Sequence, residues 1–238
     1  MITPYLEPYL IRAMRKVMTK VEDPEVKEDM QRFSAQGGNH YQQHMGVNEV
    51  FRKISAKPEA VMALEEKFKN DYESMYNSKS LRFNLAYAEG FEAVTTALSL
   101  AMLESGISKN DMSGPVADLM EWHLMEELEH RTVAFDAYEH AGGYFYKLGV
   151  SLYAQWHIIS SAYSMSKLLR SADLKFADQY NKPGMRRARF IRHVKILSGL
   201  IPGTLRTDLP WYNSRQVKVP ESFEQLKERY TELAVSHR

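Results

Sequence analysis

Cysteine is absent from this chain of 238 residues. Its absence excludes disulfides, zinc fingers with cysteine ligands, iron–sulfur clusters and a cysteine nucleophile. A metal ion would therefore have to be held by histidine, aspartate or glutamate side chains, and the sequence offers 8 His and 30 acidic residues. The lack of cysteine also fits a reducing location, and we expect a cytoplasmic protein, with contact to a membrane surface as an option.

Long uncharged apolar runs are missing as well. The most apolar stretch, residues 144–165, contains Lys147, Gln155 and His157. It therefore lacks the roughly 18 uncharged apolar residues that a spanning helix needs. Its aromatic residues recur at helical spacing, which fits core packing foremost, and otherwise the lining of a substrate channel or a membrane-facing stripe: Tyr146, Tyr153, Trp156 and Tyr163. The first residues show no basic segment followed by an apolar run, so we expect no signal peptide.

Strand-like alternation is scarce, and helical periodicity dominates. The helices are predicted at about 4–20, from Asp23 to the Gly37-Gly38 pair, 58–76, 81–105, 115–140 and 144–170, with a last helix from Ser222. Gly106 and Ser113 mark predicted helix ends, and an irregular basic tail is predicted around Pro183, Pro202 and Pro210. The sequence predicts a single all-α domain over 1–238, a helical bundle with a metal-binding core (1–140) and a basic C-terminal extension (141–238) that packs outside the core or serves an interface.

Charge is divided unevenly along the chain. Residues 1–140 carry 23 acidic and 15 basic side chains, whereas residues 141–238 carry 7 and 16. The acidic part is suited to cations, and the basic part to an anionic partner. The basic segment from Lys182 to Lys195 predicts contact with a membrane surface or an acidic partner, although a solvated basic helix would show the same pattern. No nucleic-acid recognition motif is present, so we expect no nucleic-acid partner.

The most informative motif runs from Glu121 to His130. Four of its side chains are three or four residues apart and so share one face of a helix: His123, Glu126, Glu127 and His130. The spacing Glu127-x-x-His130 is the one with which ferritin-like bundles present a carboxylate and an imidazole to a pair of metal ions. An acidic, solvated helix face would give the same short motif, so it does not decide the matter alone.

Three further helices carry acids or histidines on faces that should be apolar. His40 and His44 are spaced i, i+4. Glu89 and Glu92 lie on a mostly apolar helix, where an unpaired carboxylate is unfavourable. Glu7 lies among apolar residues near the start of the chain. Together the four segments match a di-metal bundle, in which two helices each supply a Glu and two supply Glu-x-x-His.

The sequence resembles the ferritin-like family known as predicted metal-dependent hydrolases. The resemblance rests on four blocks in the family's order, namely residues 4–15 with Glu7, residues 33–48, Glu92 followed by Thr95, and residues 122–136. It implies Glu7, Glu92 and Glu127 as carboxylate ligands and His40 and His130 as imidazole ligands. His44, Glu89, His123 and Glu126 are implied as additional ligands or as partners that orient them, and Tyr41, Tyr87 and Trp122 as neighbours of the site.

One position departs from the family pattern. The Glu that would precede His40 by three residues is replaced by Gly37, and the Gly37-Gly38 pair also weakens a helix, so this segment could be a loop between two helices. Three outcomes stay open. Glu89, or His44 with His123, replaces the missing ligand; the site holds one metal ion; or the site is degenerate and the protein is a non-catalytic relative.

The ligand set favours two metal ions, with iron first and Fe/Mn or Mn as options. The expected reaction is O2-dependent oxidation or oxygenation of a small organic substrate, with an electron donor as a further partner. Glu126, His123 and Tyr41 are the predicted catalytic residues. The alternative is hydrolysis by a metal-bound hydroxide, with Glu126 as general base. A homo-oligomer is compatible with the sequence.

Overall fold

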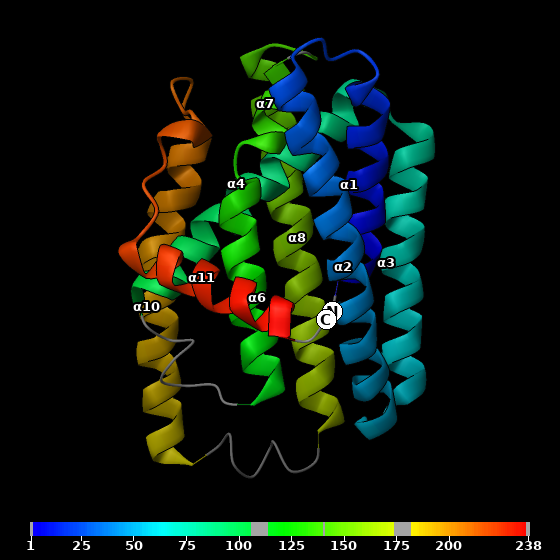
Figure 1. Ribbon diagram of the computed structural model, residues 1–238. Coiled ribbons are helices and arrows are strands. Elements are labelled where there is room, and N and C mark those ends of the chain that lie inside the picture. Colours follow the sequence, from blue (N-terminus) through cyan, green and yellow to red (C-terminus); the bar gives the residue numbers. More distant parts are fainter. Residues whose placement is uncertain (1, 106–113, 140, 174–181, 237–238) are drawn as a thin grey trace.

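The computed structural model describes residues 2–105, 114–139, 141–173 and 182–236. In these residues it contains helices and no strand, which confirms the all-α prediction (Figure 1). The α-helices are α1 (Thr3–Met18), α2 (Pro24–Ile54), α3 (Pro58–Ser78), α4 (Leu81–Ser105), α6 (Pro115–His130), α7 (Val133–Glu139), α8 (Tyr144–Ala172), α10 (Pro183–Thr207) and α11 (Glu221–Ser236), and η1 (Ser214–Gln216) is a short 3-10 helix. The sequence signals at Gly106, Ser113 and His140 lie outside the described residues.

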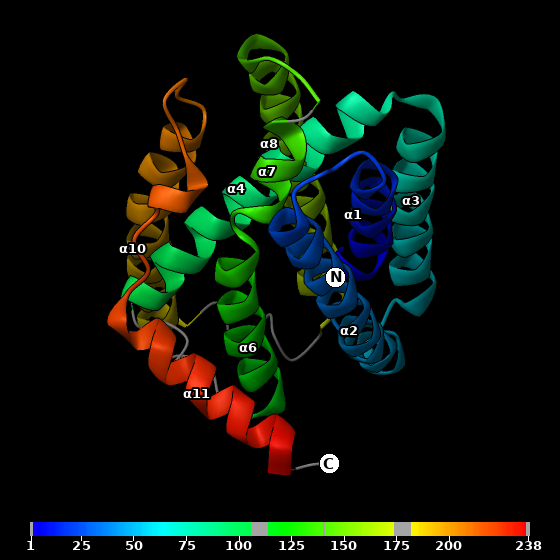
Figure 2. The same cartoon turned by 45° about the horizontal axis from the view of Figure 1, so that its top comes forward.

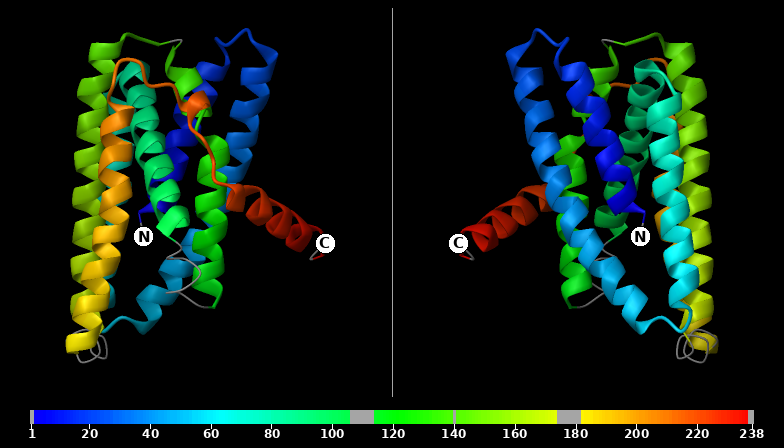
Figure 3. Two further views of the ribbon diagram at one scale, coloured as in Figure 1. Left: turned by 90° about the vertical axis from the view of Figure 1, so that its left-hand side faces the viewer. Right: turned by 90° about the vertical axis from the view of Figure 1, so that its right-hand side faces the viewer.

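Helix α4 is the centre of the fold. It packs against α1, α6, α7, α8 and α10, and most of its side chains are buried (Figure 1). A helix that is apolar on every side belongs in an interior. The main core cluster combines residues of α1, α2, α3, α4, α7 and α8, so the predicted core within residues 1–140 also receives Val150 and Ala154 from α8. Figure 3 shows α3 and α8 side by side on one flank of the bundle.

Several helix starts follow from local sequence. The Asp23 side chain accepts hydrogen bonds from the backbone N–H groups of Glu25 and Val26, and Pro24 occupies the first turn of α2. An Asp cap followed by proline satisfies the unpaired donors at a helix start. Pro58 likewise occupies the first turn of α3, although the cap residue Lys57 makes no side-chain hydrogen bond there. These predicted starts are confirmed.

The prediction that α2 ends at Gly37-Gly38, or forms a loop there, is wrong. The helix continues without interruption from Pro24 to Ile54. A Cβ atom at Gly37 would lie 3.1 Å from Ile11 Cδ1 of α1. The missing side chain therefore allows α2 and α1 to approach closely, and this packing outweighs the low helix propensity of glycine.

Two other boundaries differ from the predictions. The helix expected from 115 to 140 is broken after His130, where the Arg131 guanidinium donates a hydrogen bond to the Leu128 carbonyl. That carbonyl would otherwise accept from residue 132 if the helix continued. The tail expected to be irregular contains the continuous helix α10, with Pro202 inside it. Gly199 and Gly203 bring α10 directly against Ala101 and Ala97 of α4, and this contact offsets the cost of the proline.

The C-terminal helix α11 projects from the bundle and lies across α6 (Figures 2 and 3). A second apolar cluster joins the two, with Met125 and Leu128 of α6 against Phe223 and Leu226. The last predicted helix is thereby confirmed.

Two predictions concern the surface. The aromatic residues of α8 were expected foremost in the core, but Trp156 and Tyr163 are 64% and 68% exposed, because the side of α8 that packs on α4 carries smaller residues such as Val150 and Ala154. None of the described helices is long and apolar enough to cross a membrane. The segment Lys182–Lys195 covers the start of α10, and its contact with a membrane or acidic partner stays a prediction.

Candidate metal centre

The predicted ligands from four helices meet in the interior of the bundle. Glu7 comes from α1, His40 from α2, Glu92 from α4, and Glu127 and His130 from α6, and all five are buried. Trp122 packs beside them, with its ring centroid 5.0 Å from that of His40. The i, i+3 and i, i+4 spacing on α6 places its acids and histidines on the face that looks into the bundle.

His40 joins two carboxylates. Its Nδ1 lies 3.2 Å from Glu7 Oε1, and its Nε2 lies 2.6 Å from Glu126 Oε2. Burial lowers the pKa of His40, but the hydrogen bonds to Glu126 and Glu7 outweigh burial and raise this pKa to about 10. In the absence of a metal ion, His40 is therefore a protonated cation held between two acids.

Glu92 and Glu127 carry the clearest sign of a cation-binding site. The Oε2 atom of each is buried and has no hydrogen-bond partner among the described residues. Burial raises the pKa of both groups, and that of Glu92 is raised further by the neighbouring Glu127 and Glu7. Buried carboxylate oxygens without partners are unfavourable unless they bind protons or metal ions. The donor set present here therefore fits a divalent metal ion.

His123 and His44 extend the cluster toward the surface. His123 Nε2 lies 3.3 Å from Glu127 Oε1, and its Nδ1 lies 3.3 Å from His44 Nε2. Burial, together with the neighbouring imidazoles, lowers the pKa of both histidines to about 3. Both rings are thus neutral, the form that binds metal ions. One ligand atom each from His40, His123 and Glu127 lies within 4.8 Å of the others.

His130 has a partner that sequence reasoning missed. Its Nε2 lies 2.6 Å from Gln36 Oε1, and burial lowers its pKa well below the ordinary value. Gln36 Nε2 also donates to Glu129. Gln36 is adjacent to Gly37, and this position was the one feature of the sequence that could have indicated its contact with His130.

The place of the glutamate missing at position 37 is taken by Glu7. A Cβ atom at Gly37 would lie 2.8 Å from Glu7 Oε2. The carboxylate of Glu7 therefore fills the space beside α2, and Glu126 binds the other nitrogen of His40. Of the residues proposed to replace the missing ligand, His44 and His123 lie in the cluster, whereas Glu89 does not.

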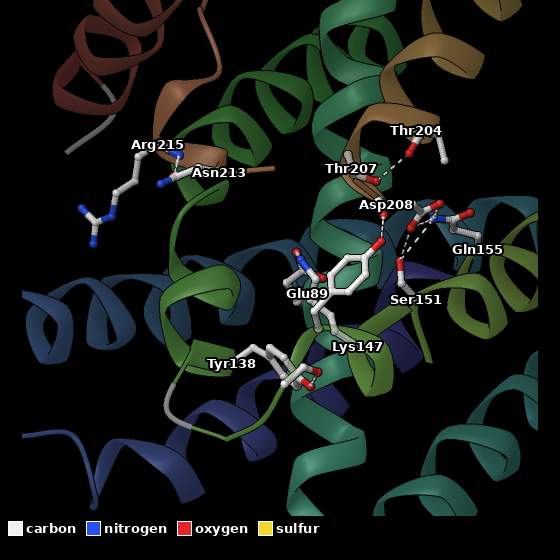
Figure 4. A network of polar contacts seen from close by, with 12 residues as sticks. Glu89, Tyr138, Lys147, Ser151, Gln155, Thr204, Thr207, Asp208, Asn213 and Arg215 are labelled. Carbon is white, nitrogen blue, oxygen red and sulfur yellow. Dashed lines mark hydrogen bonds and ion pairs between the residues drawn. The ribbon is translucent and has the colours of Figure 1, made fainter. Parts of the chain in front are cut away.

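Glu89, three residues before Glu92 on α4, binds Lys147 of α8 at 3.1 Å (Figure 4). A buried ammonium group already pairs with its carboxylate, so its role as a metal ligand stays a prediction. Close by, Ser151 and Gln155 of α8 donate hydrogen bonds to Asp208 at the end of α10 (Figure 4). This polar network joins α4, α8 and α10 rather than holding a metal ion.

Two predicted aromatic neighbours lie elsewhere. Tyr41 is 39% exposed, since it follows His40 by one residue and so points about 100° away around the helix. Its catalytic role stays a prediction. Tyr87 belongs to a separate buried network, where its hydroxyl lies 2.7 Å from His157 Nδ1 and 3.3 Å from the Tyr72 hydroxyl.

A cleft of about 1110 Å³ reaches the cluster from the surface. His44 and His123 form part of its lining, together with residues of α1, α2, α6 and α8. Since His123 also contacts Glu127, the cleft ends at the candidate metal ligands.

Comparison with known proteins gives one match. The model of the family described as "Predicted metal-dependent hydrolase" matches residues 1–217. The matched part includes every residue of the cluster and every described helix before α11. No curated protein and no solved structure matches the chain.

Proposed function

The chain belongs to the family of predicted metal-dependent hydrolases, and we propose that its buried Glu/His cluster binds divalent metal ions and catalyses hydrolysis. The observation that carries the proposal is the pair of buried oxygens without partners, Glu92 Oε2 and Glu127 Oε2. Burial raises the pKa of both carboxyl groups and so favours their protonated forms in the metal-free protein, and metal ions would replace those protons.

The ligands proposed are Glu7, Glu92 and Glu127 with His40, His123 and His130. His40 can give only one nitrogen to a metal ion, and the other nitrogen then keeps a carboxylate that fixes its tautomer. A bound divalent ion supplies a Lewis acid and lowers the pKa of water. Two ions fit the charge best, because Glu7, Glu92, Glu126 and Glu127 are four acids whose full ionisation would match two divalent cations.

Glu126 is the proposed general base. Its Oε2 accepts a hydrogen bond from His40 Nε2 at 2.6 Å, and the carboxylate has further lone pairs that can accept a proton. A carboxylate within hydrogen-bond reach of an attacking water can take the proton that hydrolysis releases. In the metal-free protein, His40 contacts Glu7 through Nδ1 and Glu126 through Nε2. If Nδ1 bound a metal ion instead, the Nε2–H would still donate to Glu126 and keep it in position.

A second candidate is O2-dependent oxidation or oxygenation of a small organic substrate, with two iron ions and an electron donor. The observation that favours it is the carboxylate-rich donor set from four helices, which is the set used by ferritin-like di-iron proteins. The ferritin-like arrangement itself remains part of this proposal. The two candidates share the ligands and differ in whether the metal changes its oxidation state.

Metal content tests the shared part of the proposal. Purified protein, and metal-free protein reloaded with Zn²⁺, Mn²⁺ or Fe²⁺, should bind metal ions, with two per chain expected. Glu92→Gln should reduce the bound metal, whereas the matched variant Glu89→Gln on the same helix should not. Less than about 0.2 metal ion per chain in wild-type protein would contradict both candidates.

The dependence of turnover on O2 distinguishes hydrolysis from oxidation. Turnover of ester or amide substrates without O2, supported by Zn²⁺ or Mn²⁺, would support hydrolysis. O2 consumption that requires Fe²⁺ and a reductant, with no anaerobic turnover, would support oxidation and contradict hydrolysis.

A further inference from the structure

The cleft beside the cluster begins where several helices end. Its lining includes Thr3, the first residue of α1, and two C-cap residues, Ser55 of α2 and Asp173 of α8. Along α2 the lining extends from Ile54 back to His44, a length of about 15 Å at the helical rise per residue. The cleft is therefore a long passage from the helix ends to the imidazoles.

The walls between these two ends are mainly apolar. They are formed by Phe51, Ile54, Met120, Ala162, Met165 and Leu169. The charged residues of the lining, Arg170 and Asp173, lie in the last turn and at the end of α8. A sugar or nucleotide needs polar partners along its whole length, whereas this wall is suited to a hydrocarbon chain.

The inner end of the cleft has an unused polar atom. His44 Nδ1 is buried and has no hydrogen-bond partner among the described residues, while His44 Nε2 faces His123 Nδ1. When His123 Nε2 gives its lone pair to a metal ion, its proton resides on Nδ1 and is donated to His44 Nε2. The proton of neutral His44 is then on Nδ1, which becomes a donor for an oxygen atom of a ligand.

We propose that this cleft binds an acyl chain, with the hydrocarbon along the apolar wall and the acyl oxygen at His44. The assignment of this compound as the substrate rests on the proposed hydrolysis, and the hydrogen bond from His44 rests on metal binding by His123, whereas the binding of the hydrocarbon rests on neither. Esters, amides or carboxylates of long chains would be bound, and polar substrates of equal size would not.

Calorimetric titration with hexanoate, decanoate and tetradecanoate, on metal-free and Zn²⁺-loaded protein, tests the inference. Affinity should rise by about fourfold for each methylene group buried. In the Zn²⁺-loaded protein, His44→Phe should weaken every member of the series by about tenfold and leave the dependence on chain length unchanged.

A matched pair of variants on α8 tests where the acyl chain binds. Ala162→Phe places a ring in the cleft and should weaken tetradecanoate binding by about tenfold or more. Ser164→Phe adds the same ring at an exposed position of the same helix outside the lining, and should bind like wild type. Equal behaviour of the two variants, or affinity independent of chain length, would overturn the inference.

Metal content measured on the same samples separates the two proposals. Binding of the acyl chain by a protein that takes up no metal ion would support the inference and contradict the proposed reaction. Metal binding together with a carboxylate affinity that does not depend on chain length would contradict the inference alone.

Discussion

At the residue scale, the two adjacent glycines of α2 have different surroundings. A Cβ atom at Gly37 would collide with Glu7 and Ile11, whereas one at Gly38 would meet nothing within 4 Å. Gly38→Ala should therefore raise the free energy of unfolding by about 0.5–1 kcal/mol through helix propensity. Gly37→Ala should not show this gain, and it should displace Glu7 and reduce metal content. Chemical denaturation and metal analysis of both variants check this, and equal stabilisation would contradict the close contact.

The charge of His40 predicts the pH dependence of the metal-free protein. Its folded pKa of about 10 lies above its ordinary value of 6.5. Its contribution to stability is therefore complete below pH 6.5 and is lost as pH rises toward 10. Between pH 7 and 9.5 the free energy of unfolding should fall by up to about 1.4 kcal/mol per pH unit.

Thermal unfolding of metal-free protein across this range measures the effect. His40→Gln should remove most of the dependence, and His193→Gln, at an exposed position of α10, should keep it. A stability that stays constant from pH 7 to 9.5 in the wild type would refute the assigned ion pair.

The sequence predicted most of the cluster, because ligand spacing on a helix is local information. The set Glu127, His130 and His123 follows from spacing on α6 alone. The role of Glu126 as the partner of His40 does not, since it depends on Glu7 occupying the space at Gly37. Glu89 and Glu92 could not be distinguished by sequence either. The difference lies in their neighbours on other helices, which are Lys147 for Glu89 and Glu127 for Glu92.

At the element scale, α4 and α8 are joined by a buried ion pair. Lys147→Met would leave the Glu89 carboxylate buried without its partner and should destabilise the fold by about 3–5 kcal/mol. The double variant Glu89→Met/Lys147→Met should recover most of that loss, because two apolar side chains replace the pair. Denaturant unfolding measures both, and metal content should be unchanged in each. Loss of metal in the double variant would restore Glu89 as a ligand.

Helix boundaries were predictable where caps and prolines decide them, as at Asp23 and Pro58. They were not predictable where a tertiary contact overrides local preference. Helix α2 continues through two glycines because α1 packs against it, and α10 continues through Pro202 because its glycines lie on α4. Neither contact leaves a mark in the local sequence.

At the scale of the whole molecule, the division into an acidic and a basic part does not separate two cores. Helix α8 lies in the basic part, yet Val150 and Ala154 belong to the main cluster. We therefore expect one cooperative unfolding transition, with an enthalpy of about 170 kcal/mol near 60 °C for a chain of this length. Differential scanning calorimetry checks it, and two separate transitions would show that residues 141–238 fold on their own.

The cleft also has a kinetic consequence. The carboxylates of Glu7, Glu92 and Glu127 are buried, so a chelator that removes metal ions has to travel inward, and the cleft lined by His123 provides a passage. A bound chain would occupy that passage. Metal loss to a chelator should then slow as decanoate is added, and the protein would retain its metal longest when the cleft is saturated with ligand.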